Sequence, residues 1–133
     1  MIGSNAFNYV NVLNKAADAS WKRNEVIANN IANVSTPGYK RKDIKFEGYL
    51  RHEIMKEYSN GKDLNGRVAA VDLDRLGTRV YTDQAELSYR KDGNNVDINT
   101  ENANLAENQI RYYTLLNSMT QEFNRIKSVL SKN

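Results

Sequence analysis

The sequence contains no cysteine, one histidine and one proline in 133 residues. Without thiols the chain forms no disulfide, and a lone histidine leaves zinc and related metals short of ligands. That residue, His52, lies between Arg51 and Glu53, where a solvated side chain is expected. No local Ser/His/Asp arrangement and no glycine-rich phosphate-binding loop is present either. We therefore expect a protein that is not an enzyme, with no catalytic residues, metal, cofactor or small-molecule substrate.

Long apolar runs and an excess of one charge are also lacking. No stretch approaches the roughly 18 apolar residues that span a bilayer. The N-terminal residues carry no basic or strongly apolar region, so no cleaved Sec signal is expected. The 19 basic and 16 acidic residues nearly balance at a net charge of +3, which does not demand an anionic partner. Acidic residues within 72–74 and 92–97 lack the complete calcium-loop pattern and are interpreted as turn carboxylates.

Both ends of the sequence do contain heptad-like spacing. Near the N-terminus, this spacing predicts a helix from about residue 4 to about residue 34. Its seam consists of Val10, Leu13, Ala17, Ser20, Asn24, Ile27, Ile31 and Val34, and a parallel row of Phe7, Ala16, Trp21 and Ala28 widens it. Near the C-terminus, the same spacing predicts a helix from about 100 to about 131, with Asn99 or Thr100 as N-cap. The second seam consists of Leu105, Gln109, Tyr112, Leu116, Met119, Phe123, Ile126 and Leu130.

These two helices predict a mainly α fold. Helices of matched length at opposite ends of a chain favour an antiparallel, coiled-coil-like core, although the long connection also permits parallel packing. The organisation is then a core helix in residues 1–36, a turn and irregular middle insertion in 37–98, and a second core helix in 99–133. Both ends together form one assembly domain. Its small and polar seam residues indicate helices that need several neighbours.

The middle of the chain has a mixed pattern. Residues 45–57 predict a short amphipathic helix, 79–82 and 87–90 predict two short strands, and Asp92-Gly93 indicates a turn. Residues 59–77 contain three glycines and little periodicity. A stretch of this length without regular structure is unusual in a compact domain, so we interpret it as a mobile or partner-ordered insertion.

A proline and a glycine end the first predicted helix. Pro37 disfavours helical structure in the residue before it, and Gly38 supplies the positive φ of a type II turn. Asn33 is expected in the left-handed conformation at the helix end. The carboxamides of Asn29, Asn30 and Asn33 either satisfy local carbonyls, which is the favoured interpretation, or bond the backbone of a neighbouring chain.

The residues after this turn offer an alternative function. Lys40-Arg41-Lys42 lies between Tyr39 and Phe46, and basic residues interleaved with aromatic ones can bind phosphates and stack on bases. Asp43 dilutes this patch and no nucleic-acid-binding motif surrounds it, so a solvated basic turn is favoured. A stand-alone helical adaptor is the other alternative.

Two stretches resemble a known family. Asn30-Ile31-Ala32-Asn33-Val34-Ser35-Thr36-Pro37-Gly38-Tyr39-Lys40 is similar to the N-terminal signature of flagellar rod and hook proteins, N-[IL]-A-N-x-x-T-P-G-[YF]-[KR]. Asp92-Gly93-Asn94-Asn95-Val96-Asp97-Ile98 and Asn108-Gln109-Ile110-Arg111-Tyr112 resemble the C-terminal region of proximal-rod proteins. The short chain also suits the smallest type of rod subunit.

The resemblance implies a structural role in the bacterial flagellar basal body. Family members are exported by the flagellar type III system without a cleaved signal, and they assemble into the periplasmic rod that serves motility. Their terminal regions are disordered before assembly and become paired helices in the rod. The implied partners are copies of the chain, other rod proteins (FlgC-like and FliE-like), the inner-membrane ring and the export apparatus, but no nucleic acid.

We expect two groups of functional residues. The motif and its turn comprise Asn30, Ala32, Asn33, Thr36, Pro37, Gly38 and Tyr39. The assembly seam comprises Leu13, Ile27, Ile31, Leu105, Tyr112, Leu116, Met119, Phe123 and Ile126.

Overall fold

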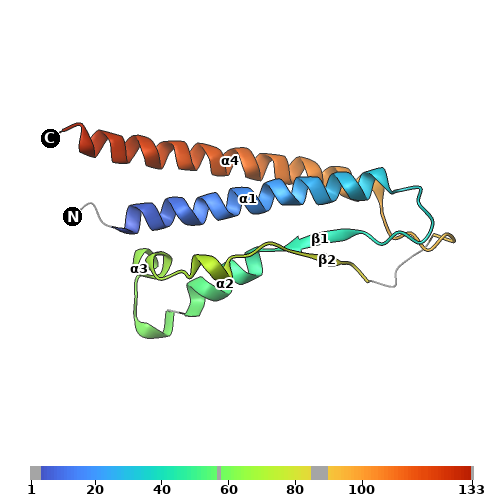
Figure 1. Ribbon diagram of the computed structural model, residues 1–133, viewed down its shortest axis with the longest axis horizontal. Coiled ribbons are helices and arrows are strands. Elements are labelled where there is room, and N and C mark those ends of the chain that lie inside the picture. The colour runs from blue at the N-terminus through green and yellow to red at the C-terminus, as the bar shows by residue number, and fades with distance from the viewer. Residues whose placement is uncertain (1–3, 57, 85–89, 133) are drawn as a thin grey trace.

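Two long helices run side by side, and the middle of the chain packs beneath one of them (Figure 1). The computed structural model describes residues 4–56, 58–84 and 90–132. The elements in chain order are α1 (Ser4–Ala32), β1 (Lys42–Lys45), α2 (Glu47–Lys56), α3 (Leu64–Ala69), β2 (Arg79–Thr82) and α4 (Ile98–Leu130). Single 3₁₀ turns at Tyr58–Asn60 and Leu73–Arg75 flank α3.

The long helices are antiparallel, as their matched lengths predict. Glu101 near the start of α4 bonds Asn30 near the end of α1, and Asn108 further along α4 bonds the earlier Ser20. Both termini therefore lie at one end of the molecule, as Figure 1 shows. The mainly α fold, with a short helix and a small sheet between two long helices, is confirmed.

The apolar core cluster lies between α1 and the middle of the chain. Val12, Ala19 and Val26 are seven residues apart and form one buried row of α1. This row packs against Ile44, Phe46, Val71 and Leu76 from the middle segments. Leu13, Ser20 and Ile27 form a second buried row of α1, and Ser20 in the middle of it accepts a hydrogen bond from Asn108 of α4. The helix thus buries two faces, because side chains seven residues apart return to the same side of a helix.

The middle of the chain has more regular structure than its sequence predicts. The helix expected at 45–57 is α2, and the strand expected at 79–82 is β2, which pairs antiparallel with the unexpected strand β1. The strand expected at 87–90 lies mostly outside the described residues. Our interpretation of 59–77 as a mobile or partner-ordered insertion is wrong, since α3 forms there and Val71 and Leu76 join the core of the single chain. Asp63 caps α3 by accepting the Gly66 N–H at 2.8 Å.

Two further expectations about the long helices need correction. Asp97, rather than Asn99 or Thr100, caps α4, because its carboxylate accepts both of their N–H groups at 2.9 and 3.2 Å. The row meant to widen the first seam does not form a buried stripe, since Trp21 is 63% exposed and Phe7 is 51% exposed. Within the described part of the chain, no helix is long and apolar enough to cross a membrane.

Candidate functional site

The two sequence motifs meet at the end of the helical pair that lies opposite the termini (Figure 1). Gly38 donates its N–H to the Asp92 carbonyl at 2.8 Å, and Lys40 Nζ donates to the Gly93 carbonyl at 2.6 Å. Tyr39 accepts the Asn95 N–H at 3.4 Å. We name residues 30–43 and 92–101 the clasp. It joins the exit from α1 to the entry into α4.

Asn94 holds the second motif against the end of α1. Its side chain is fully buried. Its amide nitrogen donates to the carbonyls of Asn33, Val34 and Thr36 at 2.9, 3.1 and 2.9 Å, and its oxygen accepts the Val96 N–H at 2.7 Å. Carbonyls at a helix C-terminus have no partner inside the helix. Asn33 directly follows the last residue of α1, so a carboxamide from a distant part of the sequence holds the end of α1 and the turn after it.

The turn after α1 has the predicted glycine geometry. Tyr39 donates its N–H to the Thr36 carbonyl at 3.2 Å, and Gly38 has a φ of 71°. The expected left-handed conformation of Asn33 is wrong, because the described residues with positive φ are all glycines. Asn33 instead donates its side-chain amide to the Asn29 carbonyl at 2.8 Å. This bond agrees with the favoured interpretation of local capping, but it does so only for Asn33 among the three asparagines.

Asn30 has a longer-range role than capping. Its oxygen accepts the Lys42 N–H at 2.8 Å, and its nitrogen donates to the Lys42 carbonyl at 2.7 Å and to Glu101 at 3.0 Å. The Tyr39 hydroxyl donates to the same oxygen at 3.1 Å. Burial, helped by the Glu101 charge, raises the pKa of Tyr39 above its usual value, which keeps this donor protonated. The carboxamide thus bonds the backbone of its own chain, so that β1 is fixed beside α1.

A buried ion pair completes the clasp. Arg41 Nε donates to Glu101 at 2.7 Å, and the other guanidinium nitrogens bond Asp83 at 3.0 Å and Asp43 at 3.3 Å. Glu101 is only 1% exposed. Burial alone would lower the pKa of Arg41, but the hydrogen bonds to Glu101 and Asp83 outweigh it and raise the pKa. A buried carboxylate is stable only when it is paired and hydrogen-bonded, as Glu101 is.

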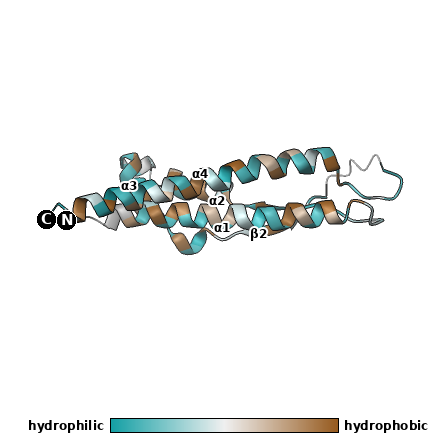
Figure 2. Cartoon of the chain, turned by 90° about the horizontal axis from the view of Figure 1, so that it is seen from above, coloured by the Kyte–Doolittle hydropathy of each residue, from teal (hydrophilic) through white to brown (hydrophobic). Residues whose placement is uncertain are grey.

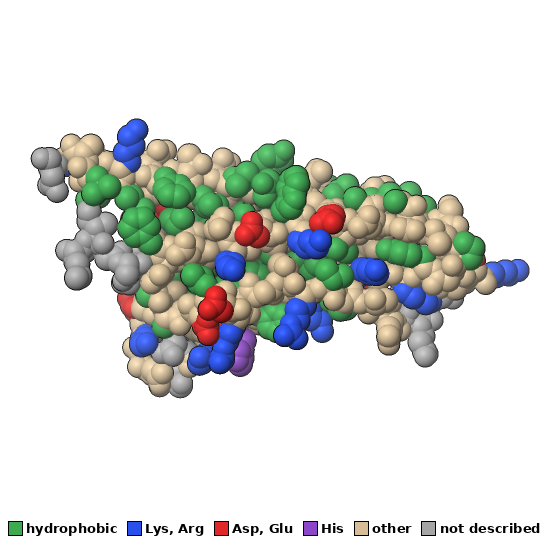
Figure 3. Space-filling model, viewed as in Figure 1, with side chains coloured by type: hydrophobic (Ala, Val, Ile, Leu, Met, Phe, Trp, Pro, Cys, Tyr) green, Lys and Arg blue, Asp and Glu red, His purple; other side chains and the backbone are tan. Residues whose placement is uncertain are grey.

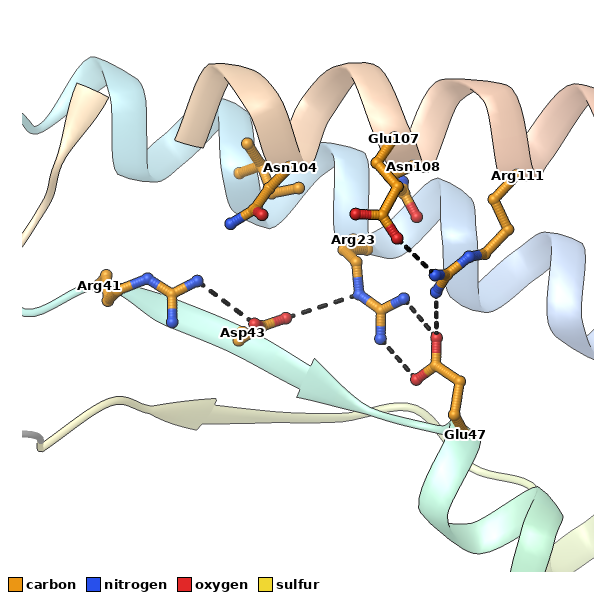
Figure 4. Close-up of a pocket in the computed structure, with 9 residues that line it drawn as sticks. Arg23, Arg41, Asp43, Glu47, Asn104, Glu107, Asn108 and Arg111 are labelled. Atoms are coloured by element: carbon orange, nitrogen blue, oxygen red, sulfur yellow. Dashed lines mark hydrogen bonds and ion pairs between the residues drawn. The ribbon is translucent and has the colours of Figure 1, made fainter. Parts of the chain in front are cut away.

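A cleft of about 350 Å³ lies beside the clasp, between the helical pair and β1 (Figure 4). Glu47 at the start of α2 bonds Arg23 of α1 at 2.7 Å and Arg111 of α4 at 2.7 Å. The Arg23 hydrogen bond, opposed by partial burial, lowers the pKa of Glu47 from 4.5 to about 2. One carboxylate therefore connects three elements. The cleft is lined by Arg23, Ile27, Arg41, Asp43, Glu47, Asn104, Glu107, Asn108 and Arg111.

The predicted seam residues occupy different environments in the single chain. Leu13 and Ile27 are buried, whereas Phe123 is 51% exposed. The remaining seam residues are half-buried, namely Ile31, Leu105, Tyr112, Leu116, Met119 and Ile126. Of the motif residues, Asn30 is buried, Asn33 and Tyr39 are half-buried, and Ala32, Thr36, Pro37 and Gly38 are exposed. Their role in assembly stays a prediction.

Several residues of the site were not predicted from the sequence. The motif of residues 92–98 was recognised, but Asn94 and Asn95 were given no role. Asn95 bridges the residues next to the two strands, because its oxygen accepts the backbone N–H of Arg41, just before β1, at 2.7 Å, and its nitrogen donates to the carbonyl of Asp83, just after β2, at 3.0 Å. A run of carboxamides next to a glycine turn was the available signal, since such side chains bond backbone groups of irregular segments.

Comparison with known proteins agrees with this arrangement. Residues 11–40 match the family model described as flagella basal body rod protein. Flagellar basal body rod protein FlgB of Bacillus subtilis (strain 168) is 37% identical over 121 residues, covering 91% of this chain and 91% of the relative. The FlgB of Borrelia hermsii is 35% identical, covering 91% and 94%, and that of Escherichia coli (strain K12) is 33% identical, covering 87% and 88%.

These relatives place the chain in the class of structural subunits of the flagellar rod. Within that class the likeness extends over nearly the whole chain. The chain belongs to the FlgB family of flagellar basal body rod proteins.

Proposed function

We propose that the chain builds the proximal part of the rod by packing its terminal helices against those of neighbouring subunits. The observation that carries this proposal is the outer surface of α4. Its buried residues are only Glu101 and Asn108, both near its start. Further along, Ile110, Tyr113 and Phe123 are 69, 65 and 51% exposed. A helix with this much exposed apolar surface calls for partners, since monomers rarely leave such surface uncovered.

The exposed apolar surface follows both long helices. Figure 2 shows hydrophobic residues recurring along α1 and α4 toward the end that carries the termini. Trp21 of α1 packs its ring against Tyr112 of α4 at a centroid distance of 5.8 Å, and it is 63% exposed. Figure 3 shows hydrophobic side chains gathered along the helical pair on one face of the molecule. At about 25 cal/mol per Å² of apolar area, burial of this surface would stabilise contacts between subunits.

The geometry of repeated contacts sets the form of the assembly. Identical head-to-tail contacts that do not close generate a helical tube. In this proposal the seam residues supply the apolar contacts, and the clasp fixes the direction in which the chain leaves the helical core. The proposed partners are further copies, FlgC-like and FliE-like rod proteins, the inner-membrane ring and the export apparatus. The proposed location is the periplasmic rod, which the chain reaches by type III export.

The nucleic-acid alternative is not favoured by the geometry of its candidate residues. Arg41 is bonded to three carboxylates, and Lys40 is bonded to the Gly93 carbonyl. Two of the three basic side chains are thus already engaged within the chain. Binding phosphate through them would require breaking the clasp.

A single-residue test compares Phe123→Asp with Asn124→Asp. Both positions are exposed on α4, and both changes introduce one negative charge. We expect each purified variant to keep the circular dichroism of the parent chain, because neither side chain is buried. In cells that lack the native gene product, Asn124→Asp should restore swimming and Phe123→Asp should not. Normal swimming and normal rods with Phe123→Asp would contradict assembly through this surface.

A further inference from the structure

The small sheet has one edge closed by side chains. The register pairs Lys42 with Thr82 and Ile44 with Val80. Both backbone groups of Lys42 bond the Asn30 side chain, so they point away from β2. In an antiparallel pair, every second residue of a strand points its backbone N–H and C=O groups away from the partner strand. The backbone groups of Ile44 are therefore outward as well, and those of Thr82 and Val80 point away from β1.

The outward groups of Ile44 are also engaged. Its N–H donates to the Asp43 carboxylate at 2.7 Å, and its carbonyl accepts from Arg23 at 3.4 Å. Together with Asn30, these side chains occupy every outward backbone group between Lys42 and Ile44. No further strand can add at this edge without displacing them.

The edge of β2 is open by contrast. No described residue bonds the outward N–H or carbonyl groups of Val80 and Thr82. All four residues of β2 are exposed, with Val80 at 45% and Tyr81 at 37%. Unpaired backbone groups beside β-branched and aromatic side chains form a template for another strand.

Cations without a carboxylate partner lie on both strands of this sheet, Lys42 and Lys45 on β1 and Arg79 on β2. Lys42, Lys45 and Arg79 are exposed, and no described carboxylate pairs with them. Lys45 faces Arg79 directly across the ladder, and its ammonium lies 4.9 Å from the centre of the Tyr81 ring. Like charges opposite each other weaken a sheet unless something neutralises them. A neighbouring strand with carboxylates would do so.

We propose that the outer edge of β2 binds an extended acidic segment of a different protein by strand addition. Main-chain hydrogen bonds to Val80 and Thr82 supply the affinity, and carboxylates beside Lys45 and Arg79 supply the selectivity. The same cations disfavour strands of like charge, including basic segments of this chain itself. This inference concerns the middle of the chain and does not depend on assembly through the long helices.

The direct test is an amide NMR titration of the ¹⁵N-labelled chain with a synthetic peptide. The probe is acetyl-Thr-Glu-Val-Glu-Val-Thr-amide, and its matched control replaces both glutamates with lysine. We expect the acidic peptide to shift the amide signals of Val80 and Thr82 and to slow their hydrogen exchange. The amides of Lys42 and Ile44, which are already bonded, should be unaffected. Equal binding of the lysine peptide, or no shift at Val80 and Thr82, would overturn the proposal. Shifts that grow with protein concentration alone would replace it with self-pairing.

Two variants separate the backbone and charge contributions. Val80→Pro removes an outward N–H and leaves the ladder bonds of the neighbouring residues, so the acidic peptide should no longer bind. Because proline can disturb the hairpin itself, the double variant Lys45→Glu with Arg79→Glu keeps the backbone unchanged. It should bind the acidic peptide about tenfold more weakly, as two exposed charge pairs are reversed.

The control for the double variant carries the same change of net charge elsewhere. Lys127→Glu with Lys132→Glu reverses two exposed cations, one in the last turn of α4 and one just after it. We expect this control to bind the acidic peptide within about twofold of the parent chain once salt screens long-range charge. An equal loss of peptide binding in both double variants would show that binding depends only on the net charge of the chain, and the proposed edge site would be wrong.

Discussion

The clasp predicts that Asn94, a polar residue in a loop, is among the most important residues for stability. Asn94→Ala removes the side-chain amide, whose NH₂ group donates to three carbonyls. It also removes the side-chain oxygen that accepts the Val96 N–H. Each lost hydrogen bond has a net value of about 1 kcal/mol, and buried groups left unpaired cost more. We expect a loss of about 3 kcal/mol in the free energy of unfolding. That is a large part of the roughly 5–15 kcal/mol that stabilises a typical domain.

The assay is urea unfolding of the purified chain, followed by circular dichroism. Asn102→Ala is the matched control, because Asn102 is exposed on α4 and should change stability by less than about 0.5 kcal/mol. Asn94→Asp keeps the shape but turns a carboxylate toward three carbonyl oxygens, so it should be no more stable than Asn94→Ala at neutral pH. A loss below about 0.5 kcal/mol for Asn94→Ala would refute the view that this side chain holds the turn after α1.

Three further predictions concern other parts of the structure. Because Gly38 has a φ of 71° and open space around it, Gly38→Ala should cost about 1–2 kcal/mol in urea unfolding from backbone strain alone, and an unchanged midpoint would contradict this. The pKa of Glu47 is lowered from 4.5 to about 2 in the folded chain. As pH falls, the unfolded chain therefore takes up the proton first, and the stability that Glu47 contributes above pH 4.5 is lost toward pH 2. Glu47→Gln should therefore flatten stability in that window and cost about 1 kcal/mol at pH 7, since the pair is half-exposed, and an unchanged pH profile would contradict this. Hydrogen exchange of the free chain should be slow in 98–112 and fast from 113 onward, because buried residues of α4 lie only near its start, and uniform protection would contradict this.

The sequence pattern predicted the long helices well because their packing is local and periodic. Side chains three, four and seven residues apart share a face of any helix, so Leu13 and Ile27 could be placed on a buried seam before the partner was known. The row of Val12, Ala19 and Val26 has the same spacing but was not assigned. Its partners come from the middle of the chain, and a periodic pattern does not state which of two apolar rows faces which neighbour.

The missed elements are those that long-range contacts stabilise. The strand β1 has the polar sequence Lys42-Asp43-Ile44-Lys45, and side chains of α1 satisfy its outer edge. The helix α3 has six residues and contains Gly66, so its own propensity is weak, and its flanking residue Val71 reaches the core. Burial of Glu101 was equally unpredictable, because an acidic residue in the first turn of a helix is usually solvated.

The polar character of the contacts between α1 and α4 has a structural consequence. An apolar seam tolerates sliding by one helical turn, about 5.4 Å, because one aliphatic side chain can replace another. Asn108 donates to the Ser20 carbonyl at 2.7 Å and to the Asn24 side chain at 2.9 Å, and sliding would break both bonds. It would also separate Glu101 from Asn30 and leave a carboxylate buried without a partner. Buried polar groups specify register in paired helices for this reason. The clasp and Asn108 thus fix the alignment of the pair inside one chain, and the proposed contacts with a neighbouring subunit require such fixed positions of the apolar residues on its outer surface.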